Sequence, residues 1–216
     1  MGSPAGSVAI FLLLLLLCLV AGAPVAEAGR ERFDFVAQGI QVGESVADAT
    51  VYTLEGTPRR LSEFWADQPM LLVTASLTCP VARQRSPAVE QLAQRFGDQV
   101  SVVMLYTIEA HPKGDPSPYA EGNEWLTPQN QKEGILCRQP RTLEERLQRA
   151  KEFQHRLGVS VPVVIDGMDN GAWQTLGSGP NMGLLIRPDG VLAAKHGWFD
   201  GKAMLRSIQT LLTDGD

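Results

Sequence analysis

Cys79 stands where a strand-forming run of residues meets a proline. The run MLLVTAS at 70–76 is almost entirely apolar, which is typical of a buried parallel strand. Residues 80–96 carry apolar side chains near helical spacing, and Pro80 suits a first helical turn because its missing N–H is harmless there. A thiol at this junction meets unpaired N–H groups and the positive end of the helix dipole. The position therefore predicts a reactive thiolate with a pKa below the ordinary thiol value of about 8.5.

The residues around Cys79 narrow the chemistry. Ser76 and Thr78 offer hydroxyls that could donate to the sulfur, and Ala82 shows that the Cys-x-x-Cys pair of a general dithiol exchanger is missing. A single nucleophile must be regenerated by an external thiol or by Cys137, the candidate resolving cysteine. Two alternatives stay open: Cys79 is a small core residue, or Cys79 and Cys137 form a structural disulfide.

Two candidate acid–base residues, Glu109 and His111, follow a second buried strand at 100–108. Ligand sites form at the carboxyl ends of parallel strands, so we expect both residues near Cys79. His111 is then a candidate proton donor or acceptor, and Glu109 is a candidate partner that orients it. A solvated loop histidine and a strand-end charge are the alternatives. Pro180, in the segment GSGP, is either a cis-proline facing the thiol or part of an ordinary turn.

Composition and spacing exclude several classes of function. The 216 residues carry a formal net charge of -5, and no basic cluster is longer than Arg59-Arg60, which argues against a nucleic-acid partner. The histidines His111, His155 and His196 are scattered without an i,i+4 pair, so no metal site is expected.

The amino-terminal residues predict export. Residues 8–23, VAIFLLLLLLCLVAGA, contain no charge, and the small-x-small sequence at 26–28 fits a cleavage site, so residues 1–28 resemble a secretory signal peptide. The first seven residues contain no Lys or Arg, so an N-terminal membrane anchor is the alternative, although the segment is short for spanning. In both cases residues 29–216 form a single domain outside the cytosol, either exported (secreted or periplasmic) or membrane-anchored.

The order of elements predicts an α/β fold with a central mixed sheet. Two short strands within 50–60 flank a Gly-Thr-Pro turn, a short helix follows at 61–69, and a loop rich in Pro, Gly, Asn and Gln occupies 112–140. The remaining expected elements are a strand at 161–166, a hairpin turning at 188–190 and a helix at 201–212.

A helix is expected at 142–157. Thr142 and Glu145 form a capping box, and Gly158 follows the end. The predicted buried stripe consists of Leu143, Leu147, Ala150 and Phe153.

Several ordered segments resemble the iodothyronine deiodinases. Ser76-Leu77-Thr78-Cys79-Pro80 is similar to the family's Ser-Cys-Thr-selenocysteine-Pro centre, with Cys79 in the selenocysteine place. MLYTIEAHP resembles the family strand that ends in Glu-Glu-Ala-His, which matches Glu109 and His111 to its catalytic acidic residue and histidine. QPRTLEERLQRA and VPVVIDGMDN resemble two further family segments, and GPNMGLLIRPDGVLAAK falls where the family has its cis-proline and final hairpin. The likeness spans roughly residues 45–212.

The resemblance implies a thioredoxin-like fold and an oxidoreductase that removes halogen from a small molecule. In this reading Cys79 is the nucleophile, His111 supplies a proton, Glu109 assists, and Ser76, Thr78, Pro80 and Pro180 support the site. No cofactor is bound, and the reductant is an external thiol or a thioredoxin-like donor. A homodimer stays open. Leu77 and Pro140 stand where animal deiodinases have a cysteine and a second histidine, so the substrate stays open as well.

Two other functions compete with dehalogenation. Ser76-x-x-Cys79 is similar to the Thr/Ser-x-x-Cys of peroxiredoxins, which favours a one-cysteine thiol peroxidase, although the proline-rich loop upstream is missing. A non-enzymatic exported thioredoxin-fold module with a Cys79–Cys137 disulfide is the third possibility.

Overall fold

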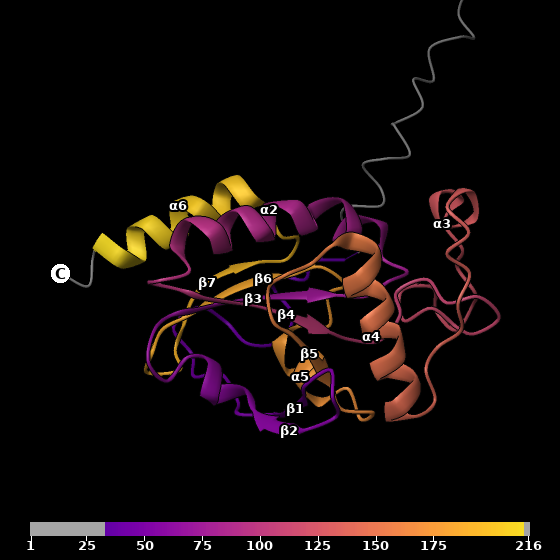
Figure 1. The fold of residues 1–216 in the computed structure, drawn as a ribbon, viewed down its shortest axis with the longest axis horizontal. Helices are drawn as coiled ribbons and strands as arrows, with labels where there is room; N and C mark the ends of the chain where they lie inside the picture. The colour runs from indigo at the N-terminus through magenta and orange to yellow at the C-terminus, as the bar shows by residue number, and fades with distance from the viewer. Residues whose placement is uncertain (1–32, 214–216) are drawn as a thin grey trace, which may run out of the picture. The chain divides into compact units, whose positions relative to one another are not determined.

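Within residues 33–213, the part of the chain that the computed structural model describes, seven strands form one mixed sheet in the order β2-β1-β5-β4-β3-β6-β7 (Figure 1). The predicted leader at 1–28 lies outside the described residues. Within the described part of the chain, residues 35–213 belong to one compact unit. The strands are β1 (Thr50–Tyr52), β2 (Pro58–Arg60), β3 (Met70–Ala75), β4 (Ser101–Tyr106), β5 (Val163–Asp166), β6 (Gly183–Ile186) and β7 (Leu192–His196).

The centre of the sheet is parallel and fully buried. β3 pairs with β4 from Met70↔Ser101 to Ala75↔Tyr106, and β4 continues parallel to β5. Every residue of β3 is buried, which explains why its sequence is continuously apolar rather than alternating. β6 runs antiparallel to β3 and β1 runs antiparallel to β5, so the expected mixed sheet is confirmed.

Helices supply the crossovers that parallel strands require. α2 (Pro80–Phe96) connects β3 to β4, and α4 (Leu143–Leu157) lies between β4 and β5 in the chain. α2 and α6 (Gly201–Thr213) lie side by side in Figure 1, and α6 buries Met204 and Ile208 while packing on β6 and β7. The other helices of the described residues are η1 (Leu61–Phe64), α3 (Pro128–Lys132) and α5 (Gly171–Leu176).

The ends of α4 lie where the sequence predicts them, but the capping box is incomplete, because the Glu145 carboxylate bonds the N–H of Arg141 and not that of Thr142. The Thr142 hydroxyl accepts a hydrogen bond from the Glu145 N–H at 3.2 Å, and the Glu145 carboxylate accepts one from the Arg141 N–H at 2.6 Å. Gly158 ends the helix in the left-handed conformation with a φ of 61°, which glycine adopts without a Cβ penalty.

The buried stripe of α4 is confirmed only in part. Ala150 and Phe153 are buried, whereas Leu143 and Leu147 are only half-buried. Arg146 is buried instead, and its Nη1 donates to the carbonyls of Asp166 at 3.2 Å and Gly167 at 2.6 Å. A hydrophobic pattern ranks a charged side chain as outward-facing, so this inward arginine escaped the prediction.

The expected loop at 112–140 contains a short helix. In α3, Thr127 is the N-cap, and its hydroxyl accepts from the Asn130 N–H at 3.1 Å. Among the described residues, no helix has the length and apolar character needed to cross a membrane.

Candidate active site

Cys79 is the N-cap residue of α2 and follows the carboxyl end of β3. Its Sγ accepts a hydrogen bond from the Ala82 N–H at 3.4 Å, and Pro80 occupies the first turn as predicted. The residue is only 1% exposed. The thiol therefore lies at the helix terminus that follows the strand, but it is buried beneath the protein surface.

The predicted lowering of the Cys79 pKa is wrong. Burial raises the pKa of the thiol to about 11, because a thiolate loses its hydration inside the protein. The N–H groups of Ala82 and Val81 and the charge of Arg83 act in the lowering direction, and Glu109 adds to the rise. The helix terminus is present, but desolvation outweighs it.

Glu109 is fully buried and bonded to the segment that precedes Cys79. Its Oε2 accepts from the Thr78 N–H at 2.9 Å and from the Thr78 hydroxyl at 2.6 Å, while its Oε1 accepts from the Tyr106 hydroxyl. Burial raises the pKa of this carboxyl, and the hydrogen bonds from Thr78 and Tyr106 partly oppose that rise. Glu109 therefore anchors the thiol segment to the end of β4.

The two hydroxyls near Cys79 bind the segment after β4. Ser76 Oγ accepts from the Ala110 N–H at 3.2 Å, and Thr78 Oγ1 accepts from the His111 N–H at 3.0 Å. The proton of the Thr78 hydroxyl goes to Glu109, so this hydroxyl does not act on the sulfur as the sequence suggested. These hydrogen bonds connect the segment after β3 to the segment after β4.

His111 is buried beside an exposed tryptophan. Its Nδ1 lies 3.2 Å from the Trp125 carbonyl oxygen, and the two rings meet edge to face with centroids 4.5 Å apart. A carbonyl oxygen can only accept, so the neutral ring carries its proton on Nδ1 and offers Nε2 as an acceptor. Burial lowers the pKa of His111 to about 4, and Arg83 acts in the same direction. The imidazole is therefore neutral at physiological pH.

Several site residues escaped the sequence analysis. Tyr106 donates to Glu109 and accepts from the Leu77 N–H at 3.0 Å. Gln139 pairs with the Glu109 backbone, accepting from its N–H at 2.9 Å and donating to its carbonyl at 2.8 Å. The three-residue spacing of Tyr106 and Glu109 at a strand end was the available signal for the first, whereas no local signal marks Gln139.

Cys137 is a buried free thiol, and so is Cys79, so the disulfide alternative is absent from the described structure. Burial and, to a lesser extent, the Glu109 charge raise the pKa of Cys137 to about 12. Cys137 lines a cavity of about 540 Å³ together with Arg138, Arg141 and other residues of the same segment. The structure therefore gives both thiols a common neighbour in Glu109.

Pro180 is not a cis-proline, because all peptide bonds of residues 33–213 are trans. Its surroundings still belong to the site region. Thr74 of β3 donates to the Gly179 carbonyl at 3.0 Å and accepts from the Met182 N–H at 2.7 Å, which holds the turn around Pro180 against the central strand.

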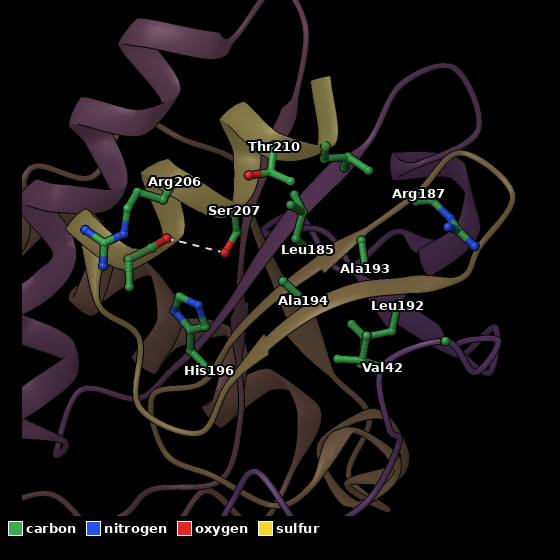
Figure 2. Close-up of a pocket in the computed structure, with 13 residues that line it drawn as sticks. Val42, Leu185, Arg187, Leu192, Ala193, Ala194, His196, Arg206, Ser207 and Thr210 are labelled. Atoms are coloured by element: carbon green, nitrogen blue, oxygen red, sulfur yellow. Dashed lines mark hydrogen bonds between the residues drawn. The ribbon is translucent and has the colours of Figure 1, made fainter. Parts of the chain in front are cut away.

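Two other features of the described residues lie outside this cluster. No group of three His, Cys, Asp or Glu side chains in this part of the chain could hold a metal ion. A cavity of about 710 Å³ lies between α6 and the β6–β7 hairpin, lined among others by Leu185, His196 and Arg206 (Figure 2). None of the predicted site residues lines that cavity.

A family model described as iodothyronine deiodinase matches residues 30–197. The chain belongs to the iodothyronine deiodinase family. The type II iodothyronine deiodinase of Rattus norvegicus is 27% identical over 127 residues, covering 57% of this chain and 44% of that protein. The type II enzyme of Fundulus heteroclitus is 29% identical over 116 residues, covering 52% of this chain and 40% of that protein. The match therefore spans less than half the length of these relatives.

Solved structures show that this deiodinase-family chain has a thioredoxin-like fold. The thioredoxin domain of a thiol-disulfide oxidoreductase from Bacteroides vulgatus superposes with a TM-score of 0.55 at 14% identity, covering 80% of this chain and 99% of that one. A thiol:disulfide interchange protein from Bacteroides sp. gives 0.56 at 14% identity, covering 79% and 90%. A secreted Mycobacterium tuberculosis disulfide oxidoreductase gives 0.50 at 13% identity, covering 76% and 96%.

Proposed function

We propose that this chain is a deiodinase-like thiol oxidoreductase that removes a halogen atom from a small molecule by reduction. The observation that carries the proposal is the placement of Cys79. By the resemblance of its sequence segment, Cys79 takes the family's selenocysteine place. It caps the start of α2, and Thr78 next to it is bonded to Glu109 and His111. Nucleophile, acid–base candidate and anchoring carboxyl thus come from adjoining strand ends.

The reaction balances with two equivalents of thiol. The Cys79 thiolate attacks the halogen, an S–halogen bond forms, the carbon–halogen bond breaks, and its electron pair stays on carbon, which takes up a proton. An external thiolate then attacks the Cys79 sulfur and releases halide, leaving a mixed disulfide. A second thiol frees Cys79 and leaves as the disulfide, so the substrate is reduced, the external thiols are oxidised, and no bound cofactor takes part.

His111 is the proposed proton carrier, and since its pKa of about 4 lies far below the Cys79 pKa of about 11, the transfer requires substrate binding to bring the two values together. Since the thiol is protonated at neutral pH, a base must receive its proton before attack. Nε2 of the neutral imidazole is an acceptor, and the imidazolium that results can return the proton to carbon. The backbone of His111 is fixed to Thr78, the neighbour of the nucleophile.

The reductant and the location of the chain belong to the same proposal. We propose that an external thiol or a thioredoxin-like donor resets Cys79, with Cys137 as the competing resolving thiol. We also propose that the domain acts outside the cytosol, exported or membrane-anchored, on the basis of the uncharged apolar stretch at 8–23.

A paired substitution tests the function. Purified wild type, Cys79→Ser and Cys137→Ser are assayed for thiol-dependent iodide release from iodothyronines and other iodinated phenols, and for peroxide consumption in parallel. We expect Cys79→Ser to abolish halide release and Cys137→Ser to retain it with a small thiol as reductant. Halide release that survives Cys79→Ser contradicts the proposal. Peroxide consumption that depends on Cys79, without halide release, would favour the peroxidase instead.

A further inference from the structure

Arg83 is a buried cation one helical turn after Cys79. Its side chain is 5% exposed, and its guanidinium donates to three groups. Nη1 donates to the Leu77 carbonyl at 2.6 Å, and Nη2 donates to Asn130 Oδ1 at 2.8 Å and Glu133 Oε2 at 2.9 Å. A charged side chain is almost never this buried without a specific partner set, and this set leads directly to the thiol segment.

Asn130 of α3 extends the same contact. It is fully buried, and its Nδ2 donates to the Thr78 carbonyl at 2.8 Å. Arg83 and Asn130, bonded to each other, therefore hold the carbonyls of Leu77 and Thr78, the two residues that precede Cys79.

The N–H groups of the same two residues are held from the other direction. The Leu77 N–H donates to the Tyr106 hydroxyl at 3.0 Å, and the Thr78 N–H donates to Glu109 at 2.9 Å. All four backbone polar groups of this dipeptide thus have side-chain partners. Because the dipeptide leads into Cys79, its fixed orientation sets the direction in which the thiol points.

The titratable groups around the thiol come from α2 and from the segment after β4. Arg83 on α2 lowers the pKa of Cys79 and Glu109 after β4 raises it, both beneath the larger effect of burial. The Tyr119 hydroxyl, from the loop after β4, is close enough for the Cys79 charge to raise its pKa. Arg83 is the cation among these groups, so it opposes the effect of both burial and Glu109 on the thiolate.

We propose that Arg83 is a positioning residue for Cys79: its guanidinium fixes the thiol segment through the Leu77 carbonyl and Asn130, and its charge stabilises the thiolate. The proposal rests on the proposed function only in taking Cys79 as the reacting group. Arg83 itself touches no reacting atom and acts through the segment and the field it creates.

The test compares Arg83→Met and Arg83→Lys with Arg85→Met. Arg85 is on the same helix and donates to the Phe199 carbonyl, so its loss removes a similar contact away from the thiol. Alkylation of Cys79 by iodoacetamide is followed against pH by the mass of the Cys79 peptide. In Arg83→Met we expect the midpoint to rise by about 1 pH unit. We also expect thiol-dependent turnover to fall about tenfold or more with little change in KM.

The other variants separate charge from orientation. Arg83→Lys keeps the positive charge but loses the branched guanidinium contacts, so we expect the Cys79 midpoint to stay near that of the wild type while turnover falls. Arg85→Met should leave both the midpoint and the turnover unchanged. A folded Arg83→Met with the wild-type midpoint and turnover would overturn the proposal. If Arg83→Met fails to fold, Arg83→Gln decides: the glutamine amide can still donate to the Leu77 carbonyl, but the positive charge is lost, so the Cys79 midpoint must rise. An unchanged midpoint in a folded Arg83→Gln overturns the proposal as well.

The failure of this inference is distinguishable from failure of the proposed function. Midpoint shifts in the expected directions, in a wild-type protein that releases no halide, would support Arg83 and contradict dehalogenation. Halide release by the wild type, with no midpoint shift in the Arg83 variants, would support dehalogenation and contradict the role of Arg83.

Discussion

Two opposing effects act on the Cys79 thiol. The helix terminus favours the thiolate, whereas burial in the protein interior favours the neutral thiol. A helix terminus contributes on the order of 1 kcal/mol to a charge, whereas full burial shifts a pKa by up to about 3–5 units. Sequence locates the terminus, because Pro80 and the strand before it are local signals. Burial depends on the loop after β4 and on α3, which are distant in the chain, and this is why the predicted direction was wrong.

His111 is the residue whose loss best tests proton transfer. His111→Ala should lower turnover by roughly 10²–10⁴, the usual contribution of a general acid–base group. The measurement is the thiol-dependent rate between about pH 5 and 8. His155→Ala is the matched control, because His155 is exposed on α4. A His111→Ala rate close to wild type would leave Cys79 to act with water or Glu109.

The lowered pKa of His111 also predicts a pH dependence of stability. Its folded pKa of about 4 lies below the ordinary 6.5, so the unfolded chain binds the proton more readily. The stability from neutral His111 is present above 6.5 and is lost as the pH falls towards 4.

Urea unfolding of wild type and His111→Gln on both sides of this window measures the loss. The glutamine amide can still donate to the Trp125 carbonyl, so the variant should lose less stability on acidification. The raised pKa of Glu109 acts in the opposite direction in both proteins and cancels in the comparison. Parallel losses in the two proteins would contradict a buried neutral His111.

At the scale of elements, α4 supports the end of β4. The Phe153 ring meets the Tyr106 ring edge to face with centroids 5.6 Å apart, and the Tyr106 hydroxyl bonds Glu109. Packing on α4 therefore reaches the thiol segment through one strand. Because of this coupling, we expect buried Phe153 to contribute more to the stability of the domain than the half-buried Leu143 and Leu147.

Phe153→Ala should lower the free energy of unfolding by about 3–5 kcal/mol, the cost of a large cavity in a core. Leu147→Ala, on the same helix but half-buried, should cost clearly less. Thermal and urea unfolding of both variants check the order. Equal losses would mean that the helix buries a different face.

The elements differ in how far sequence could reveal them. β3, α2 and the ends of α4 depend on apolar runs, Pro80, Thr142 and Gly158, all of which act within a few residues. α3 has five residues and gains its place from tertiary contacts, through Asn130 to Arg83 and Thr78. A helix this short has no periodic pattern, so the sequence could not reveal α3. The burial of Arg83 depends on α3 and could not be predicted either.

At the scale of the whole molecule, the sheet order places β3 beside β4. In the loop that follows β4, the Ser117 hydroxyl donates to the Ala110 carbonyl at 2.7 Å, and the Tyr119 hydroxyl donates to the Ser178 carbonyl at 2.9 Å, near Pro180. Because Cys79 is almost fully buried, a substrate can reach it only when a neighbouring segment moves, and we expect this loop to be that segment.

Tyr119→Phe tests whether that loop controls access. The variant loses the hydrogen bond to Ser178 and keeps the ring that packs edge to face on Phe35 at 5.7 Å. A net hydrogen bond of about 0.5–1.5 kcal/mol corresponds to about a two- to tenfold change in the open population. Alkylation of Cys79 at fixed pH should therefore accelerate by about that factor, whereas Tyr52→Phe, in β1, should not change it. An unchanged rate in Tyr119→Phe would show that another segment limits entry to the thiol.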